Sequence, residues 1–214
     1  HRRLIRKKPW YLVLGTEHSG KKHFIANTGL YFAKPEHFGQ EAVNYTNEFP
    51  DFDWWFSEQA VMVDAMTYNK DEDLANWKRF MKLLKRERKH KPLNGIILTI
   101  SLSDVMLYSN QKRQDFIQDI SLYIRNIHAQ FKAQVPVYLV FTKCDLVEGF
   151  LEYFNDLNKE ELNQVLGMTF PMSEACTLEN VRRVFMSEYT GIIRRLRKRV
   201  LWILDTERTM RGRE

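Results

Sequence analysis

Short apolar runs alternate with stretches of helical periodicity along this chain, and this alternation constrains its fold more than any other feature. Each run has the length of a strand and is nearly continuous in apolar residues, as expected for a strand with both faces buried. The runs are Trp10–Leu14, Ala60–Asp64, Gly95–Ile100 and Pro136–Phe141. Because strands that alternate with helices form a mostly parallel sheet flanked by those helices, the sequence predicts an α/β fold.

Apolar residues at helical spacing predict the helices between these runs. In the stretch 72–89, Trp77, Phe80, Met81 and Leu84 fall on one helical face. Further helices are predicted from Phe24 to Asn27, at 111–132, at 150–157 and at 178–205. The polar stretch 31–51 is predicted to be a loop, 53–56 a strand and 167–171 an edge strand.

Length and composition exclude several classes of protein. The 214 residues suit one large domain, or one domain with a helical addition. Two cysteines, Cys144 and Cys176, form neither a disulfide framework nor a metal set, which indicates a reducing compartment. No window approaches the roughly 20 apolar residues of a membrane-spanning helix. The basic first residues lack the apolar core of a signal peptide.

The net charge of +6 is concentrated in clusters. The clusters lie at Arg2–Lys8, Lys82–Lys91 and Arg194–Arg199. Solvated helix faces and chain ends account for such clusters, and attraction to anionic lipid is the alternative. No signature of a nucleic-acid-binding module accompanies the charge, so nucleic acid is not an expected partner.

The segment from Gly15 to Lys22 fits the pattern G-x-x-x-x-G-K and separates an apolar run from a predicted helix. That context is the one a phosphate-binding P-loop requires. Glycines let the backbone turn its N–H groups toward an anion, and Lys21 can reach the β- and γ-phosphates. The predicted phosphate-binding residues are Gly15, His18, Ser19, Gly20, Lys21 and Lys22.

Lys22 departs from the active pattern, because a Ser or Thr hydroxyl normally binds Mg²⁺ at this position. A charged lysine is no metal ligand and places positive charge where the ion would lie. Glu17 also adds negative charge to a loop meant for phosphates. The loop therefore either holds a nucleotide without the usual magnesium ligand or serves only as a connection from strand to helix.

Asp64 ends an apolar run, as the magnesium-associated carboxylate of the Walker B pattern does. In GTPases this residue begins the motif D-x-x-G, whose glycine senses the γ-phosphate. Thr67 stands in the place of that glycine, so a γ-phosphate switch is not expected. No catalytic residue and no metal-ligand set is predicted, because no glutamine is placed after Asp64 and the histidines are scattered.

Thr142-Lys143-Cys144-Asp145 directly follows the last apolar run and matches the guanine-reading motif [NT]-K-x-D. A carboxylate can accept two hydrogen bonds from the N1–H and the exocyclic amine of guanine, and adenine offers no such pair. Thr142, Lys143 and Asp145 are therefore predicted to bind a guanine nucleotide. The alternative is an ordinary polar turn at the end of a strand.

Three large aromatic residues follow one another in Asp53–Phe56. Consecutive aromatics are unfavourable on a bare surface. They suit a packed cluster at a strand, and the alternative is a partner site in which Trp and Phe serve as anchors.

Taken together, these segments resemble the IcmF/TssM family. The matching segments are Pro9–Gly15, Asn27–Leu30, Asp53–Phe56, Pro92–Ile97, Ser101–Asp104, Pro136–Leu146 and Gly167–Pro171. With the motifs above, the resemblance implies a P-loop NTPase domain of the small-GTPase type over 9–171. A basic juxtamembrane-like segment at 1–8 and a C-terminal helical extension at 172–214 complete the predicted organisation.

The resemblance further implies an inner-membrane subunit of a bacterial type VI or type IVB (Dot/Icm) secretion apparatus, with this domain at the cytoplasmic face. It implies membrane attachment through segments outside this chain. A DotU/TssL-like membrane protein and other secretion-complex subunits are the implied partners, and GTP or GDP is the implied ligand. A structural and assembly role with slow or no hydrolysis is expected; a working GTPase or ATPase that drives assembly is the alternative.

Overall fold

The computed structural model describes residues 4–65, 72–131, 135–162, 164–170 and 178–211. The chain divides into two compact units, His1–Glu148 and Gly149–Glu214. Every strand of the described residues belongs to the first unit, and the second unit is helical.

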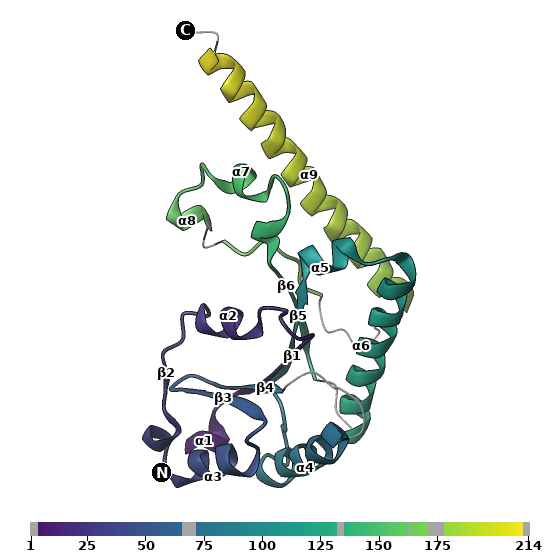
Figure 1. Cartoon of the computed structure of the whole chain (residues 1–214). Helices are drawn as coiled ribbons and strands as arrows, with labels where there is room; N and C mark the ends of the chain where they lie inside the picture. The colour runs from purple at the N-terminus through teal and green to yellow at the C-terminus, as the bar shows by residue number, and fades with distance from the viewer. Residues whose placement is uncertain (1–3, 66–71, 132–134, 163, 171–177, 212–214) are drawn as a thin grey trace. The chain divides into compact units, whose positions relative to one another are not determined.

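Within the described residues, six strands form one mixed sheet at the centre of the first unit (Figure 1). The strands are β1 (Trp10–Gly15), β2 (Phe32–Ala33), β3 (Phe52–Ser57), β4 (Val61–Ala65), β5 (Gly95–Ser101) and β6 (Val137–Thr142). Their order is β2-β3-β4-β1-β5-β6. Strands β4, β1, β5 and β6 run parallel, whereas β2 and β3 pair antiparallel with their neighbours. The predicted α/β class is confirmed.

Two apolar clusters cover the two faces of this sheet. Leu12 and Leu14 of β1 belong to the larger cluster, with Phe80 of α4 (Glu72–Glu87) and Ile127 of α6 (Asn110–Phe131). Val13 faces the other way, into a smaller cluster with Ile25 of α2 (Lys21–Ala26). The alternation of β1 side chains between the faces explains why its sequence is apolar at successive positions.

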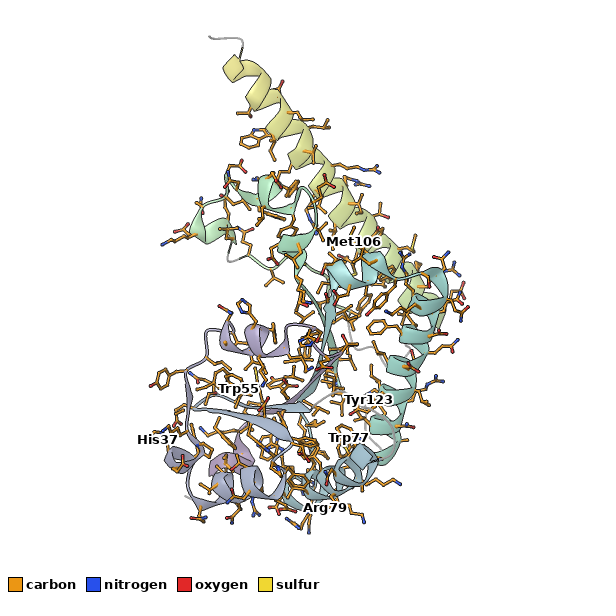
Figure 2. All side chains as sticks on the ribbon, in the orientation of Figure 1. His37, Trp55, Trp77, Arg79, Met106 and Tyr123 are labelled. Carbon is orange, nitrogen blue, oxygen red and sulfur yellow. The ribbon has the colours of Figure 1, made fainter. Side chains whose placement is uncertain are left out.

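Most predicted helices are confirmed by the structure. They appear as α2, α4, α6, α7 (Phe150–Phe154) and α9 (Leu178–Arg211). Figure 2 shows Trp77 and Tyr123 lying against each other, with ring centroids 4.9 Å apart, where α4 meets α6. Outside the stretch 31–51, the described elements that were not predicted are α1 (Leu4–Lys7), α5 (Leu102–Leu107), the 3₁₀ turn η2 (Cys144–Leu146) and α8 (Lys159–Leu162).

The prediction of a loop over 31–51 is wrong. This stretch holds β2, the 3₁₀ helix η1 (Pro35–Phe38) and α3 (Gln40–Glu48). Ala42, Tyr45 and Phe49 are buried at a spacing of one helical face, although the residues between them are polar except for Val43. A single narrow apolar stripe is enough to attach a short helix to a core, and it is easily overlooked in a polar sequence.

The predicted edge strand at 167–171 is also wrong for 167–170, which form no strand; residue 171 lies outside the described residues. A strand needs a neighbour to accept and donate its hydrogen bonds. Phe170 instead stacks against Phe185 of α9 inside the second unit.

Side-chain contacts connect α7 to α9 in the second unit. The Tyr153 hydroxyl donates to the Leu196 carbonyl at 3.2 Å, and the Arg199 guanidinium donates to the Asp156 carboxylate at 2.7 Å. No helix among the described residues combines the length and apolar content that crossing a membrane requires.

The aromatic run at Asp53–Phe56 lies in β3 and packs on both sides of it. Trp54 stacks on Tyr45 with centroids 5.7 Å apart and meets Trp10 edge-on at 5.8 Å. Trp55 points to the opposite face and meets Phe32 edge-on. These contacts support the interpretation of a structural cluster.

Replacement of Tyr45 by Ala should therefore destabilise the chain by about 3 kcal/mol, because the change leaves a cavity between Trp10 and Trp54. Urea unfolding followed by tryptophan fluorescence measures the difference. Asn47→Ala, on the exposed face of the same helix, is the matched control and should change the free energy of unfolding by less than about 0.5 kcal/mol. Equal effects of the two substitutions would contradict the packing of α3.

Candidate functional site

The parallel strands bring the predicted site residues to one edge of the sheet. Val13 of β1 pairs in register with Asp64 of β4, and Gly15 pairs with Thr99 of β5. Thr142 ends the next strand, β6. Ligands of open α/β sheets bind outside the carboxyl ends of such strands, so this edge is the candidate site.

Two glycines shape the loop from Gly15 to Lys22. A Cβ at Gly15 would collide with the side-chain oxygens of Ser19 and Thr99 and would lie 2.7 Å from the Thr99 carbonyl oxygen. Gly20 has φ 81° and ψ 16°, a left-handed conformation, and caps the start of α2. Its missing side chain leaves room for Thr142, whose Cβ would be 3.4 Å away. The glycines are thus required by close approach and by backbone conformation.

Hydrogen bonds from the neighbouring strands fix the middle of this loop. The Ser19 and Thr99 hydroxyls lie 2.8 Å apart, and Thr99 Oγ1 also donates to the Leu14 carbonyl at 3.1 Å. The Thr142 hydroxyl donates to the Ser19 carbonyl at 2.6 Å. The loop is therefore tied to both β5 and β6.

Lys21 lies inside the loop, with its side chain only 10% exposed. Its ammonium donates to the carbonyls of Gly15 at 3.2 Å and Thr16 at 3.1 Å. The Lys21 Nζ is also 3.9 Å from Asp64 Oδ1. The Lys21 ammonium is thus bound to carbonyls of the loop itself and lies beside the Asp64 carboxylate.

Asp64 is almost completely buried at the end of β4, with 2% of its surface exposed. Burial raises the pKa of Asp64 to about 6, although the charge of Lys21 lowers it. The carboxylate of Asp53, paired across the sheet, raises it further. No described group hydrogen-bonds to Asp64 Oδ1. The carboxylate is costly to keep ionised, and the cations beside it reduce that cost.

Lys22 points away from the loop interior and binds Asp53 of β3, with Nζ 2.8 Å from Oδ2. The hydrogen bond to Asp53 raises the pKa of Lys22, so the ammonium stays charged. No group of three potential metal ligands is present among the described residues. Lys22 therefore offers no hydroxyl to Mg²⁺, and its ammonium pairs with Asp53, one of the two carboxylates at this edge of the sheet.

The segment Thr142–Asp145 continues from β6 directly beside the loop. Lys143 has a left-handed backbone, with φ 54°, and its ammonium is 3.6 Å from Asp104 Oδ2. Asp145 is exposed in η2, and no described residue forms a hydrogen bond or ion pair with it. A carboxylate that is solvated and unpaired in this way is available to a ligand.

The structure thus brings together most of the predicted residues and separates a few. The residues in mutual contact are Gly15, Ser19, Gly20, Lys21, Asp64 and Thr142. His18 is exposed beside Glu17, and the place of Thr67 lies outside the described residues.

Sequence reasoning missed Thr99 and Asp53. Thr99 was detectable as the polar residue inside an apolar run, whereas the role of Asp53 depends on a strand pairing that the sequence does not specify.

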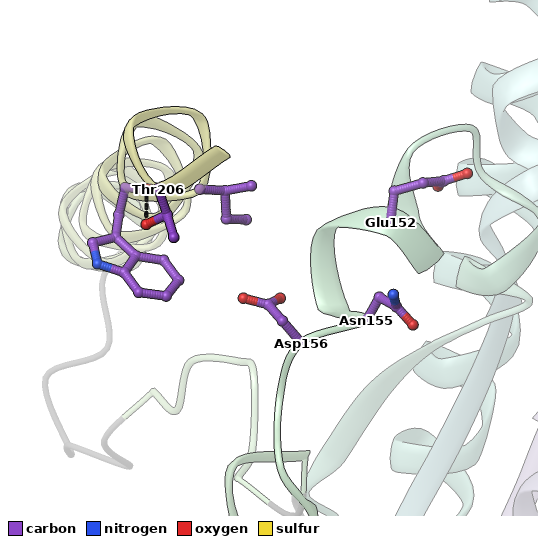
Figure 3. Close-up of a pocket in the computed structure, with 6 residues that line it drawn as sticks. Glu152, Asn155, Asp156 and Thr206 are labelled. Atoms are coloured by element: carbon purple, nitrogen blue, oxygen red, sulfur yellow. Dashed lines mark hydrogen bonds between the residues drawn. The ribbon is translucent and has the colours of Figure 1, made fainter. Parts of the chain in front are cut away.

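A hollow lies on the second unit, between α7 and α9 (Figure 3). It is lined by Glu152, Asn155, Asp156, Trp202, Ile203 and Thr206. Asp156 is paired with Arg199, and the Thr206 hydroxyl donates to the Trp202 carbonyl at 2.9 Å. The hydrogen bonds of Asp156 and Thr206 are thus made to other residues of the second unit. The sheet edge therefore remains the candidate site.

Comparison with known proteins adds two matches. A family model described as the IcmF-related N-terminal domain matches residues 70–214. The chain is also 37% identical over 213 residues to the type VI secretion system component TssM1 of Pseudomonas aeruginosa. That alignment covers 97% of this chain and 19% of the relative, so the chain spans about a fifth of the relative's length.

The buried carboxylate generates a prediction about pH. Because the pKa of Asp64 is raised on folding, its ionisation opposes folding, and the wild type loses stability as pH rises from about 4 through about 6. Asp64→Asn has no carboxyl group to ionise at this position. It should therefore be more stable than the wild type at about pH 7.5, by roughly 2 kcal/mol. Urea unfolding measures the difference in free energy of unfolding at about pH 7.5 and at about pH 5. The advantage of Asp64→Asn should be smaller at about pH 5, by about 1 kcal/mol. A pH-independent difference would contradict the raised pKa.

Proposed function

Because this chain belongs to the IcmF/TssM family of secretion-system components, we propose that it is the cytoplasmic domain of an inner-membrane subunit, with a structural role in assembling the complex. The proposal includes a nucleotide-binding P-loop that keeps its phosphate-binding residues and has lost its metal position. The observation that supports this proposal is the different placement of the two lysines. The Lys21 ammonium lies inside the loop, whereas the Lys22 ammonium binds Asp53.

The proposed ligand is a guanine nucleotide, GTP or GDP. Lys21 lies inside the curled loop, where a phosphate would exchange for the carbonyls of Gly15 and Thr16. The bond from Thr142 to Ser19 joins the guanine-reading segment to this loop, as simultaneous recognition of base and phosphates requires. Asp145 then supplies the carboxylate for the base.

Slow or absent hydrolysis follows from the charges at the loop. Phosphoryl transfer depends on a metal ion that neutralises the developing charge and on a residue that positions the attacking water. Lys22 supplies a fixed positive charge in place of the metal, yet its bond to Asp53 directs it toward β3. Binding without efficient turnover suits a part that stays in an assembled complex.

The second candidate is a working GTPase or ATPase whose nucleotide cycle drives assembly. Gly15, Gly20, Lys21 and Asp64 favour it, because they lie in the arrangement that such a site uses. The two candidates differ in whether Mg²⁺ supports binding and phosphate release.

A component of a secretion system has other subunits of that complex as partners. The specific partner we propose is a DotU/TssL-like membrane protein, with membrane attachment through segments of the protein outside this chain. Type VI secretion is the proposed system, since the matched relative is a type VI component.

Titration of the purified chain with labelled GTP, GDP and ATP, with Mg²⁺ or with EDTA, tests the proposal. Guanine nucleotides should bind in EDTA, and phosphate release should stay at background. Asp145→Asn should weaken GDP binding by roughly tenfold to a hundredfold, as expected for lost hydrogen bonds to a charged group. Steady Mg²⁺-dependent phosphate release would establish the second candidate instead.

A substitution at Lys22 should restore the metal requirement. Lys22→Thr removes the resident cation and returns a hydroxyl, so Mg²⁺ should strengthen GDP binding by about tenfold or more, whereas wild-type binding should not respond. Lys22→Ala removes the charge without adding a ligand and is the matched control. Equal Mg²⁺ responses in all three proteins would refute the assignment of Lys22 as the replacement for the metal.

A further inference from the structure

The outward face of α4 carries a row of cations, and no exposed acid lies among them between Lys78 and Lys91, where the structure describes every side chain. Its exposed residues include Lys78, Arg79, Lys82, Lys85 and Arg86, and the exposed Lys89 and Lys91 follow the helix. Figure 2 shows Arg79 on the outer side of α4. These cations lie on the face opposite the apolar residues that attach the helix to the core, so they form one continuous basic surface, which we call the α4 basic face.

The acid within this stretch, Glu87, is turned away from that surface. Its side chain is 8% exposed and forms ion pairs with Arg6 at 2.6 Å and Arg86 at 2.7 Å. The carboxylate that could neutralise the α4 basic face is therefore used to attach α1 to α4. Most of the cations on the face have no described acid within ion-pairing distance, Arg86 being the exception.

Arg88 joins a second basic segment to this face. Its guanidinium donates to the Lys8 carbonyl at 2.7 Å and to Asn94 Oδ1 at 2.8 Å, and it also bonds the Arg6 carbonyl. The same group lies over the Trp10 ring at 5.5 Å. These contacts hold α1 at the end of α4, and the exposed Lys7 extends the basic face.

The α4 basic face is rigid because the opposite side of the helix is fully packed. Phe80, Met81, Leu83 and Leu84 are each at most 2% exposed. Consequently α4 has no free apolar side to insert into another phase. A ligand of this face meets mainly ammonium and guanidinium groups, with the exposed carboxylates of Glu48 and Asp51 at its margin.

We propose that the α4 basic face adsorbs the domain onto an anionic lipid surface. A plane of phosphate headgroups matches a row of lysines on one helix, since lysine acts as a mobile point charge that needs no fixed geometry. Single-stranded nucleic acid would instead require exposed aromatics for stacking, and Trp77 and Phe80 of this helix are buried. The adsorption is electrostatic, without insertion, and weakens with salt.

Co-sedimentation of the purified chain with vesicles tests this proposal. The chain should bind phosphatidylglycerol-containing vesicles at low salt, release in high salt, and ignore vesicles of phosphatidylcholine alone. Each basic residue at such a surface changes affinity by about fivefold. Lys82→Glu, Lys85→Glu and Lys89→Glu together should therefore lower binding by about a hundredfold or more.

The matched control reverses three exposed cations of α9, in Arg194→Glu, Arg195→Glu and Lys198→Glu. It has the same net charge as the α4 variant and should lose less than about tenfold in binding. Circular dichroism should show wild-type melting for both variants; if the α4 variant is unfolded, the neutral set of Gln substitutions at the same three lysines replaces it. Equal loss in both variants or binding to neutral vesicles would each overturn the proposal.

Discussion

The hydroxyl of Thr99 is the point on which the candidate site depends. It lies between the Leu14 carbonyl and the Ser19 hydroxyl, and so connects the end of β1 to the loop that follows. Thr142 completes the attachment from the other side through the Ser19 carbonyl. Because buried hydrogen bonds of this kind are expensive to leave unmade, they stabilise this conformation of the loop. That conformation places Lys21 inside the loop and leaves Lys22 at its rim.

The charges at this edge follow from that geometry. Asp53 and Asp64 lie opposite each other on neighbouring strands, and two like charges so placed oppose each other's ionisation. Lys21 reduces the cost for the buried carboxylate, and Lys22 pairs with the exposed one. The site therefore balances its own charge with lysines, where a magnesium-dependent site would rely on a bound ion.

The sequence predicted the sheet strands and long helices because their signals are local. An apolar run or a stripe of side chains at helical spacing lies within one segment, as in β5 and α4. Helix α3 was not predicted, because its main apolar contacts come from Ala42, Tyr45 and Phe49, which stand in an otherwise mostly polar stretch. The site was predicted as a set of motifs, but the pairing of Lys22 with Asp53 depends on which strand lies beside β4, and that is a property of the tertiary fold.

The C-terminal end of the α4 basic face and the loop lie at opposite ends of β1. Arg88 contacts the chain around Trp10, where β1 begins, whereas the loop follows Gly15, where β1 ends. Six residues of strand separate these ends by about 20 Å. Two anion-attracting surfaces at this separation, beyond the screening length of about 8 Å at physiological ionic strength, act independently. The proposed adsorption through α4 therefore leaves the proposed nucleotide site, at the other end of the same strand, uncovered.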